Sequence, residues 1–220
     1  MMLKERVPET NEGIQDGLTV DHFDVFQRSM RDRGIMETKD IIKSGINRGE
    51  ALEVGPGPGY LGLEWLKATW DTQLTGIEIS PNMVKMEMKN AEEYRFLDRV
   101  KYIQGNAMEM PFEDGIFDGA FTNGSLHEWE YPERVFAEIF RVLKPGGRFF
   151  VSDMKRNVSP LLAGIMRLTA KPRAIRPGFD SSLAAAYTRT EMEDVLRKAG
   201  IKADVDENPF GLNITGIKAE

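Results

Sequence analysis

The residues with the clearest chemical potential form the segment LEVGPGPGYLG, which begins at Leu52. Glu53 lies inside a short apolar run, and three alternating glycines come after it, Gly55, Gly57 and Gly59. Glycine lacks a β-carbon, so it lets a ligand approach the backbone closely and adopts conformations that other residues resist. A helix that begins after such a turn offers unpaired amide groups to an anionic or polar molecule. The segment therefore predicts a strand, a tight turn and a helix that bind a small molecule with a carboxylate or a phosphate.

Two classes of nucleotide ligand fit this turn. Gly57, Gly59 and Gly62 satisfy the dinucleotide fingerprint. Glu78 follows at about the distance expected of the acid that binds a ribose hydroxyl in such folds. The set of three glycines that begins two residues earlier, at Gly55, resembles instead the glycine motif of class I S-adenosylmethionine-dependent methyltransferases. An acid, Glu53, lies inside the strand before it. Spacing alone does not decide between the two.

Further candidate residues follow other predicted strands. Glu78 lies near the end of an apolar run over residues 73–79, and the residues that begin with Ser80 are typical of a helix start. In an open parallel sheet, ligands bind at the edge formed by the carboxyl ends of the strands. The loops after two more predicted strands, residues 100–104 and 116–122, reach the same edge.

The alternation of strand and helix predicts the fold class. We expect an α/β protein with a doubly wound, mostly parallel sheet of seven strands and an antiparallel C-terminal hairpin. The predicted strands are residues 51–54, 73–79, 100–104, 116–122, 148–153, 201–206 and 212–218. The predicted helices are residues 21–33, 38–43 and 161–170, with others beginning after Gly59 and Ser80, at Pro132 and at Thr188, where Glu191 completes a capping box.

The first predicted helix carries an apolar stripe. Phe23, Phe26 and Met30 recur at helical spacing, with Asp21 as the expected N-cap and Gly34 as the stop. The favoured interpretation is that the stripe packs on the core. The alternative is that its two phenylalanines help to close a ligand pocket.

Length and composition describe an ordinary globular chain. The 220 residues fit one domain over residues 1–220, with a helical extension at 1–45 and a lid-like insertion at 154–187. The net charge of −6 gives no general attraction for nucleic acid. The absence of cysteine excludes disulfides, thiolate catalysis and cysteine zinc sites. Without an apolar targeting core at the N-terminus or a run of membrane-spanning length, we expect a cytoplasmic protein.

The order of the motifs resembles the class I S-adenosylmethionine-dependent methyltransferases, in the small-molecule branch that includes the quinone and sterol methyltransferases. The glycine turn, the acid that ends the second strand, the segments GNAMEMPFEDGIFDGAF and RVLKPGGRFF, and the closing hairpin carry this resemblance. It covers roughly residues 45–220 and is strongest over residues 51–153. It implies a Rossmann-like methyltransferase fold and methyl transfer from S-adenosylmethionine, with S-adenosylhomocysteine as the product.

The resemblance also assigns roles along the cofactor. The glycine turn and Glu53 would surround its amino acid end, and Glu78 would accept hydrogen bonds from both ribose hydroxyls. Asn106 stands where the family more commonly has aspartate, but its amide carbonyl can still accept from the adenine amine, so we expect retained and weaker binding. The full implied set is Glu53, Gly55, Pro56, Gly57, Gly59, Glu78, Ile79, Met83, Asn106, Ala107, Met108, Asn123 and Gly124.

The reaction implied by the resemblance is an in-line displacement at the methyl carbon. Much of its acceleration can come from holding the acceptor aligned in a site with little water. Where the acceptor must lose a proton, His127 is the best-placed base, with Glu128 as the second choice. The other interpretation is that His127 only lines the pocket. Asp153 ends a predicted strand at the same edge and either touches the substrate or is a plain strand-end acid.

The insertion after the fifth strand is ambiguous. Residues 154–179 contain the predicted helix over residues 161–170 and then a predicted loop with Pro172 and Pro177, and they carry basic side chains and no acidic one. One interpretation is a lid whose Arg173 or Arg176 meets an anionic or amphipathic small-molecule acceptor, with apolar residues from Leu161 to Leu168 as its inner wall. The other is a solvated basic face with those apolar residues packed on the body.

Other functions stay open at this stage. An NAD-dependent oxidoreductase would use the same glycines, but the chain is short for a dinucleotide fold plus a substrate domain, and the final hairpin would be unexplained. An S-adenosylmethionine-binding interaction protein without turnover would carry the same motifs. We expect no metal site, because two histidines far apart and no cysteine give no zinc-like spacing, although carboxylates alone could hold magnesium. The sequence does not specify an oligomeric state.

Overall fold

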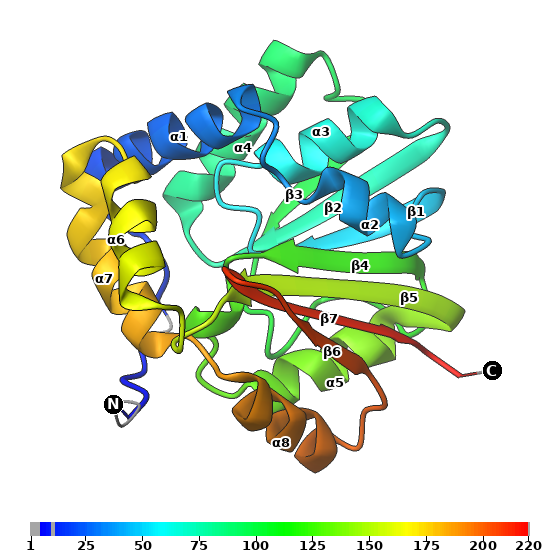
Figure 1. The fold of residues 1–220 in the computed structure, drawn as a ribbon. Coiled ribbons are helices and arrows are strands. Elements are labelled where there is room, and N and C mark those ends of the chain that lie inside the picture. The colour runs from blue at the N-terminus through cyan, green and yellow to red at the C-terminus, as the bar shows by residue number, and fades with distance from the viewer. Residues whose placement is uncertain (1–4, 10–11, 220) are drawn as a thin grey trace.

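The centre of the molecule is one seven-stranded sheet. The structure is a computed structural model that describes residues 5–9 and 12–219. Its strands are β1 (Gly49–Val54), β2 (Thr72–Glu78), β3 (Val100–Gln104), β4 (Phe117–Asn123), β5 (Leu143–Met154), β6 (Asp204–Glu207) and β7 (Gly211–Ile217). They lie in the order β3-β2-β1-β4-β5-β7-β6 (Figure 1), and β7 is antiparallel to both of its neighbours while the other pairs are parallel. This confirms the predicted mostly parallel sheet and its closing antiparallel hairpin.

Helices cover both faces of the sheet. The described helices are α1 (Gly17–Asp32), α2 (Thr38–Lys43), α3 (Tyr60–Ala68), α4 (Pro81–Tyr94), η1 (Leu126–Glu128), α5 (Pro132–Val142), α6 (Pro160–Thr169), η2 (Arg173–Ile175), α7 (Arg176–Ala185) and α8 (Arg189–Ala199). Residues of α5 and α8 join one apolar core cluster, and residues of α2 and α3 join the other. In Figure 1, α1, α6 and α7 gather beyond one end of the strands.

Local sequence explains where several helices begin and end. The Ser80 side chain accepts a hydrogen bond from the backbone of Met83, and Pro81 occupies the first turn, where it costs no helical hydrogen bond. Thr188 and Glu191 form the predicted capping box at the start of α8. Gly200 ends that helix in the left-handed conformation, with φ of 70°.

The two largest differences from the predicted element boundaries are the starts of α1 and β5. The N-cap of α1 is Asp16, whose carboxylate accepts from the Thr19 backbone at 2.8 Å, so the helix begins four residues before the predicted start and Asp21 lies inside it. Strand β5 begins at Leu143, directly after α5, because Leu143 already pairs with Phe117 of β4. A register shift then absorbs the LysProGlyGly segment, which alone suggested a turn.

The segment around Pro172 and Pro177 is also different from its prediction. We expected a loop there, and the structure has η2 followed by α7. Pro177 lies in the first turn of α7, a position that needs no backbone N–H. A proline that looked like a loop marker is therefore a helix start.

A buried polar network fixes α1 against the body. Asp24 of α1 is 7% exposed, and its Oδ1 accepts from the Tyr60 hydroxyl at 2.8 Å and from Asn90 Nδ2 at 3.0 Å. Asn90 also donates to the Pro58 carbonyl at 2.9 Å. The network joins α1, α3 and α4 beside the glycine turn.

Removal of one hydrogen bond from this network is expected to destabilise the fold. Tyr60→Phe should lower the free energy of unfolding by about 1–3 kcal/mol, because the buried Asp24 carboxylate loses a donor that water does not replace. The matched control is Tyr131→Phe, at a tyrosine that is 42% exposed, for which a change below about 0.5 kcal/mol is expected. Urea unfolding measures both, and equal effects would contradict the assignment.

Candidate active site

A large cavity lies beyond the carboxyl ends of β1, β2, β4 and β5. Its volume is about 1100 Å³. That exceeds the ~300–1,000 Å³ typical of a site for one small ligand, so the cavity has room for two. Its walls come from the strand ends, the N-terminal segment, α1, the α6–α7 insertion and the loop between β6 and β7.

Nearly all the sequence-predicted site residues line this cavity. Gly59 is the exception: it is the N-cap of α3, with φ of 82°, and it faces Tyr102 instead. The predicted residues that line the cavity are Glu53, Gly55, Pro56, Gly57, Glu78, Ile79, Met83, Asn106, Ala107, Met108, Asn123, Gly124 and His127.

The turn after β1 requires glycine for two reasons. Gly55 and Gly57 have φ of 62° and 57°, a region that residues with side chains rarely adopt. A β-carbon on Gly55 would also lie 2.8 Å from the side chain of Ser125, which is too close, whereas one on Gly57 would make an ordinary contact at 3.4 Å from the Phe23 ring. The turn therefore brings bare backbone to the cavity wall.

Backbone groups fix the Glu78 carboxylate at the end of β2. The Ser80 N–H donates to Oε1 at 2.9 Å, and the Gly57 N–H donates to Oε2 at 3.2 Å. Burial raises the pKa of Glu78, although these backbone hydrogen bonds oppose the rise. Each oxygen keeps acceptor capacity for a further donor.

Glu53 is more completely buried and lacks one partner. The residue is 2% exposed, and no hydrogen bond to its Oε2 is found among the described residues. Burial raises its pKa to about 8, opposed by the Gly62 N–H and helped by the Glu78 charge. A β-carbon on Gly62 would lie 2.2 Å from Oε2, so Gly62 leaves the space that the carboxylate occupies.

A histidine and an acid are paired at the other end of the strand edge. His127 Nδ1 lies 2.8 Å from Asp153 Oδ2, and the His127 backbone N–H donates to the same oxygen at 2.7 Å. The His127 Nε2 lies 3.5 Å from Oε2 of Glu9. Burial lowers the pKa of His127, but the Asp153 charge and hydrogen bond outweigh it and raise the pKa to about 9.

Comparison with known proteins identifies the domain around this cavity. Residues 52–151 match a family model described as a methyltransferase domain. The chain is 37% identical to a sterol 4-C-methyltransferase of Caenorhabditis elegans over 47% of this chain and 30% of that protein. It is 30% identical to a ubiquinone/menaquinone biosynthesis C-methyltransferase of Serratia proteamaculans over 56% of this chain and 49% of that protein. Residues 52–151 of the chain correspond to a methyltransferase domain.

A solved structure shows the same fold over nearly the whole chain. A Methanococcus maripaludis protein assigned as an S-adenosyl-L-methionine-dependent methyltransferase superposes with a TM-score of 0.76 and 22% identity, over 99% of this chain and 98% of that one. This confirms the predicted Rossmann-like methyltransferase fold. The matches give no support to the NAD-dependent alternative. The chain spans half or less of the two curated relatives named above.

The apolar stripe of α1 forms part of the cavity wall. Phe23, Phe26 and Met30 line it, as the less favoured sequence interpretation held. The stripe could not be assigned from spacing alone, because a helix that covers a cavity and one that covers the core have the same periodicity. Asn106 Oδ1 accepts from the Met108 backbone at 2.9 Å, so the oxygen predicted to meet the adenine amine already has one donor.

The cavity wall is strongly acidic. Among its described residues there is one histidine and no lysine or arginine. Burial raises the pKa of Glu37 and of Glu128 to about 7 each. Sequence analysis missed Glu9 and Glu37, which no motif or periodicity marks. The acidic residues of the wall are Glu9, Glu37, Glu53, Glu78, Glu128, Glu130 and Asp153.

The basic insertion does not place a cation in the cavity. Neither Arg173 nor Arg176 lines it, and Arg176 instead donates to the Ala170 carbonyl at 3.3 Å. Arg167 pairs with Asp180 at 2.8 Å, just beyond the acid-free segment. The structure thus disagrees with a lid that presents arginine to an anionic substrate.

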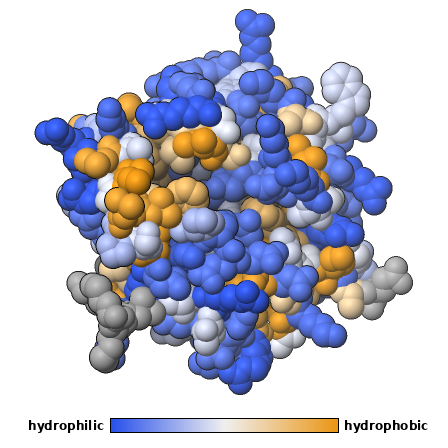
Figure 2. Space-filling view, in the orientation of Figure 1, coloured by the Kyte–Doolittle hydropathy of each residue, from blue (hydrophilic) through white to orange (hydrophobic). Residues whose placement is uncertain are grey.

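The expected apolar inner wall is also largely absent. Of the apolar residues between Leu161 and Leu168, Met166 lines the cavity. Leu161, Ile165 and Leu168 are instead 77%, 49% and 64% exposed. Figure 2 shows apolar side chains gathered over the region where Figure 1 places α6 and α7.

Within the described part of the chain, no helix has the length and apolarity to cross a membrane.

The raised pKa values predict how stability depends on pH. The ordinary glutamate pKa is 4.5, and the folded state raises that of Glu53 to about 8 and that of Glu37 to about 7. Between these values the folded state holds protons that the unfolded state has released, so the free energy of unfolding should fall as pH rises from about 5 to about 8. Urea unfolding across that range measures it.

A matched pair of variants assigns the slope. Glu53→Gln should weaken the pH dependence, because glutamine does not ionise, and Glu113→Gln at an exposed position should leave it unchanged. Stability that stays level or rises between about pH 5 and about pH 8 would show that the buried acids do not titrate in this way.

Proposed function

We propose that this chain transfers the methyl group of S-adenosylmethionine to a small-molecule acceptor by in-line displacement. The observation that carries the proposal is one cavity with two buried carboxylates, Glu53 and Glu78, beside the glycine turn. His127 lies in the same cavity. The cavity volume of about 1100 Å³ supports simultaneous binding of donor and acceptor.

The donor side of the cavity fits the chemistry of S-adenosylmethionine. Its ammonium supplies a donor for Glu53 Oε2, which has no hydrogen-bond partner among the described residues. Its ribose hydroxyls supply donors for the free acceptor sites of Glu78. The acidic wall suits a ligand that carries both an ammonium and a sulfonium. The proposed contacts to adenine and its surroundings are Ile79, Met83, Asn106, Ala107 and Met108, with Asn123 and Gly124 toward the sulfur.

The acceptor side is assigned to the His127 end. Asp153 holds Nδ1, so Nε2 is the ring nitrogen that faces the acceptor end of the cavity. A free imidazole whose pKa is about 9 is mostly protonated near neutral pH, which disfavours simple proton abstraction by this ring. We propose His127 as the catalytic residue at this end of the cavity. Its role is to position the acceptor's reacting atom for attack on the methyl carbon.

The remaining wall supports a largely apolar or amphipathic acceptor. Ile175 and Phe179 of the insertion and Phe210 of the last hairpin line this space. Because no lysine or arginine among the described residues does so, we favour a neutral or amphipathic acceptor over an anionic one. We also propose that residues 1–220 form one domain. In it, the extension at 1–45 and the insertion at 154–187 close the cavity. We propose that the protein acts in the cytoplasm.

Loss of the Glu78 charge is expected to weaken cofactor binding. Glu78→Gln should reduce affinity for S-adenosylhomocysteine at least about tenfold, since a hydrogen bond to a charged group contributes about 1.5–3 kcal/mol. Calorimetric titration measures this. Glu50→Gln, at an exposed glutamate of β1, is the control and should bind as the native protein does. Absence of S-adenosylhomocysteine binding by the native protein would refute the proposed function.

Substitution of His127 is expected to slow transfer without loss of cofactor binding. With methyl-labelled S-adenosylmethionine and small-molecule extract of the source cells, His127→Asn should deposit label about 10²–10⁴ times more slowly. His22→Asn, at the other histidine of the chain, is the control. If the native protein binds the product cofactor but deposits no label, the chain is the non-catalytic binding protein instead.

A further inference from the structure

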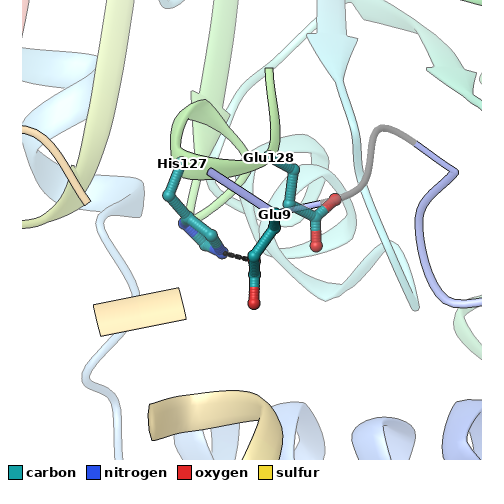
Figure 3. A group of neighbouring side chains, drawn as sticks. All are labelled: Glu9, His127 and Glu128. Carbon is teal, nitrogen blue, oxygen red and sulfur yellow. Dashed lines mark ion pairs between the residues drawn. The ribbon is translucent and has the colours of Figure 1, made fainter. Parts of the chain in front are cut away.

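The geometry points to a divalent metal site formed by Glu9, His127 and Glu128 at the acceptor end of the cavity. This inference rests on the proposed function for its role and on the side-chain arrangement for its existence. One ligand atom from each residue lies within 4.8 Å of the others. Figure 3 shows the Glu9 and His127 side chains pointing toward each other, with Glu128 beside them. Ligands of one ion at about 2.0–2.2 Å lie up to about 4 Å apart, so small side-chain movements would complete the site.

The Asp153 contact prepares His127 to bind a metal. Metal-ligating histidines commonly donate their other ring N–H to a carboxylate, which fixes the tautomer and the ring orientation. Here Asp153 Oδ2 lies 2.8 Å from Nδ1, and the Asp153 side chain is 2% exposed. A metal ion would displace the proton of Nε2, the atom that faces Glu9, and bind its lone pair while Nδ1–H donates to Asp153.

Nε2 has no other partner in the part of the chain that the structure describes. The His127 side chain is 5% exposed, and the Glu9 oxygen 3.5 Å away is beyond ordinary hydrogen-bond distance. An ion between Nε2 and the Glu9 carboxylate would bind both in place of this long contact.

Glu9 is itself held in position for this role. The Ser181 hydroxyl donates to its Oε1, and the Ser182 hydroxyl lies 3.4 Å from both carboxylate oxygens, with Oε2 toward His127. Arg6, three residues earlier, donates to the His127 carbonyl at 3.0 Å, so the N-terminal segment is anchored beside the same turn. A ligand from this segment would tie the segment to the cavity.

The ligand set favours a first-row transition ion over magnesium. Imidazole suits Zn²⁺ and other borderline metals, carboxylate suits Mn²⁺, and Mg²⁺ prefers oxygen ligands alone. Three protein ligands leave coordination positions open toward the cavity, as in catalytic metal sites. An acceptor hydroxyl at such a position would lose its proton more readily. The proton would leave to water, the O–CH₃ bond would form as the S–CH₃ bond breaks, and the donor would become a neutral thioether.

The test is Mn²⁺ binding to the full chain, by calorimetry and by electron paramagnetic resonance. We expect one Mn²⁺ per chain, nitrogen hyperfine coupling from the imidazole, and at least about tenfold weaker binding in Glu9→Gln and in Glu128→Gln. Glu37→Gln removes a wall carboxylate outside the three ligands and should bind Mn²⁺ as the native chain does.

The outcomes separate this inference from the proposed function. S-adenosylhomocysteine titration of each variant confirms that the fold is intact. A native chain that binds S-adenosylhomocysteine but neither Mn²⁺ nor Zn²⁺ at millimolar concentration overturns the metal site alone. Mn²⁺ binding that lacks nitrogen coupling, or that is equal in the native chain and both ligand variants, also overturns it. If the native chain binds metal but not S-adenosylhomocysteine, the metal site would stand and the proposed function would be refuted.

Discussion

Carboxylates buried at the carboxyl edge of the sheet impose the main constraint on this molecule. Each one costs free energy to desolvate, and burial raises the pKa values of Glu53, Glu78 and Glu128. Backbone N–H groups offset part of that cost at Glu78, and the orphan oxygen of Glu53 shows that the offset is incomplete. A cationic ligand would supply the positive charge and the hydrogen-bond donors that these carboxylates lack in the protein alone. This is the physical reason that an acidic cavity and a sulfonium nucleoside suit each other.

The sheet makes this arrangement possible by bringing distant residues to one edge. Strands β1, β2, β4 and β5 all end there, so Glu53, Glu78 and Asp153 converge although many residues separate them. The glycine turn lets backbone replace side chains at the centre of the edge. Helix α1 and the insertion then cover the opening, and the network around Asp24 fixes α1 to the body.

The repeated pattern of strands and helices made the sheet predictable, and the cofactor edge followed from it. Glu53 and Glu78 could be found because each lies at a fixed place relative to a strand end. Glu9 could not, because it belongs to a polar segment with no periodicity and reaches His127 through tertiary packing alone. The same limit hid the grouping of Glu9 with His127 and Glu128, since residues 9 and 127 have no spacing that indicates a metal site. Pro177 misled for a local reason, because a proline opens a helix as readily as it interrupts one.

A crystal structure of the protein with S-adenosylhomocysteine tests the central claim most directly. The account predicts the ribose against the Glu78 carboxylate, the amino group within hydrogen-bond distance of Glu53, and the sulfur facing the turn that carries His127. A nucleoside bound elsewhere, or one whose sulfur faces away from His127, would contradict it.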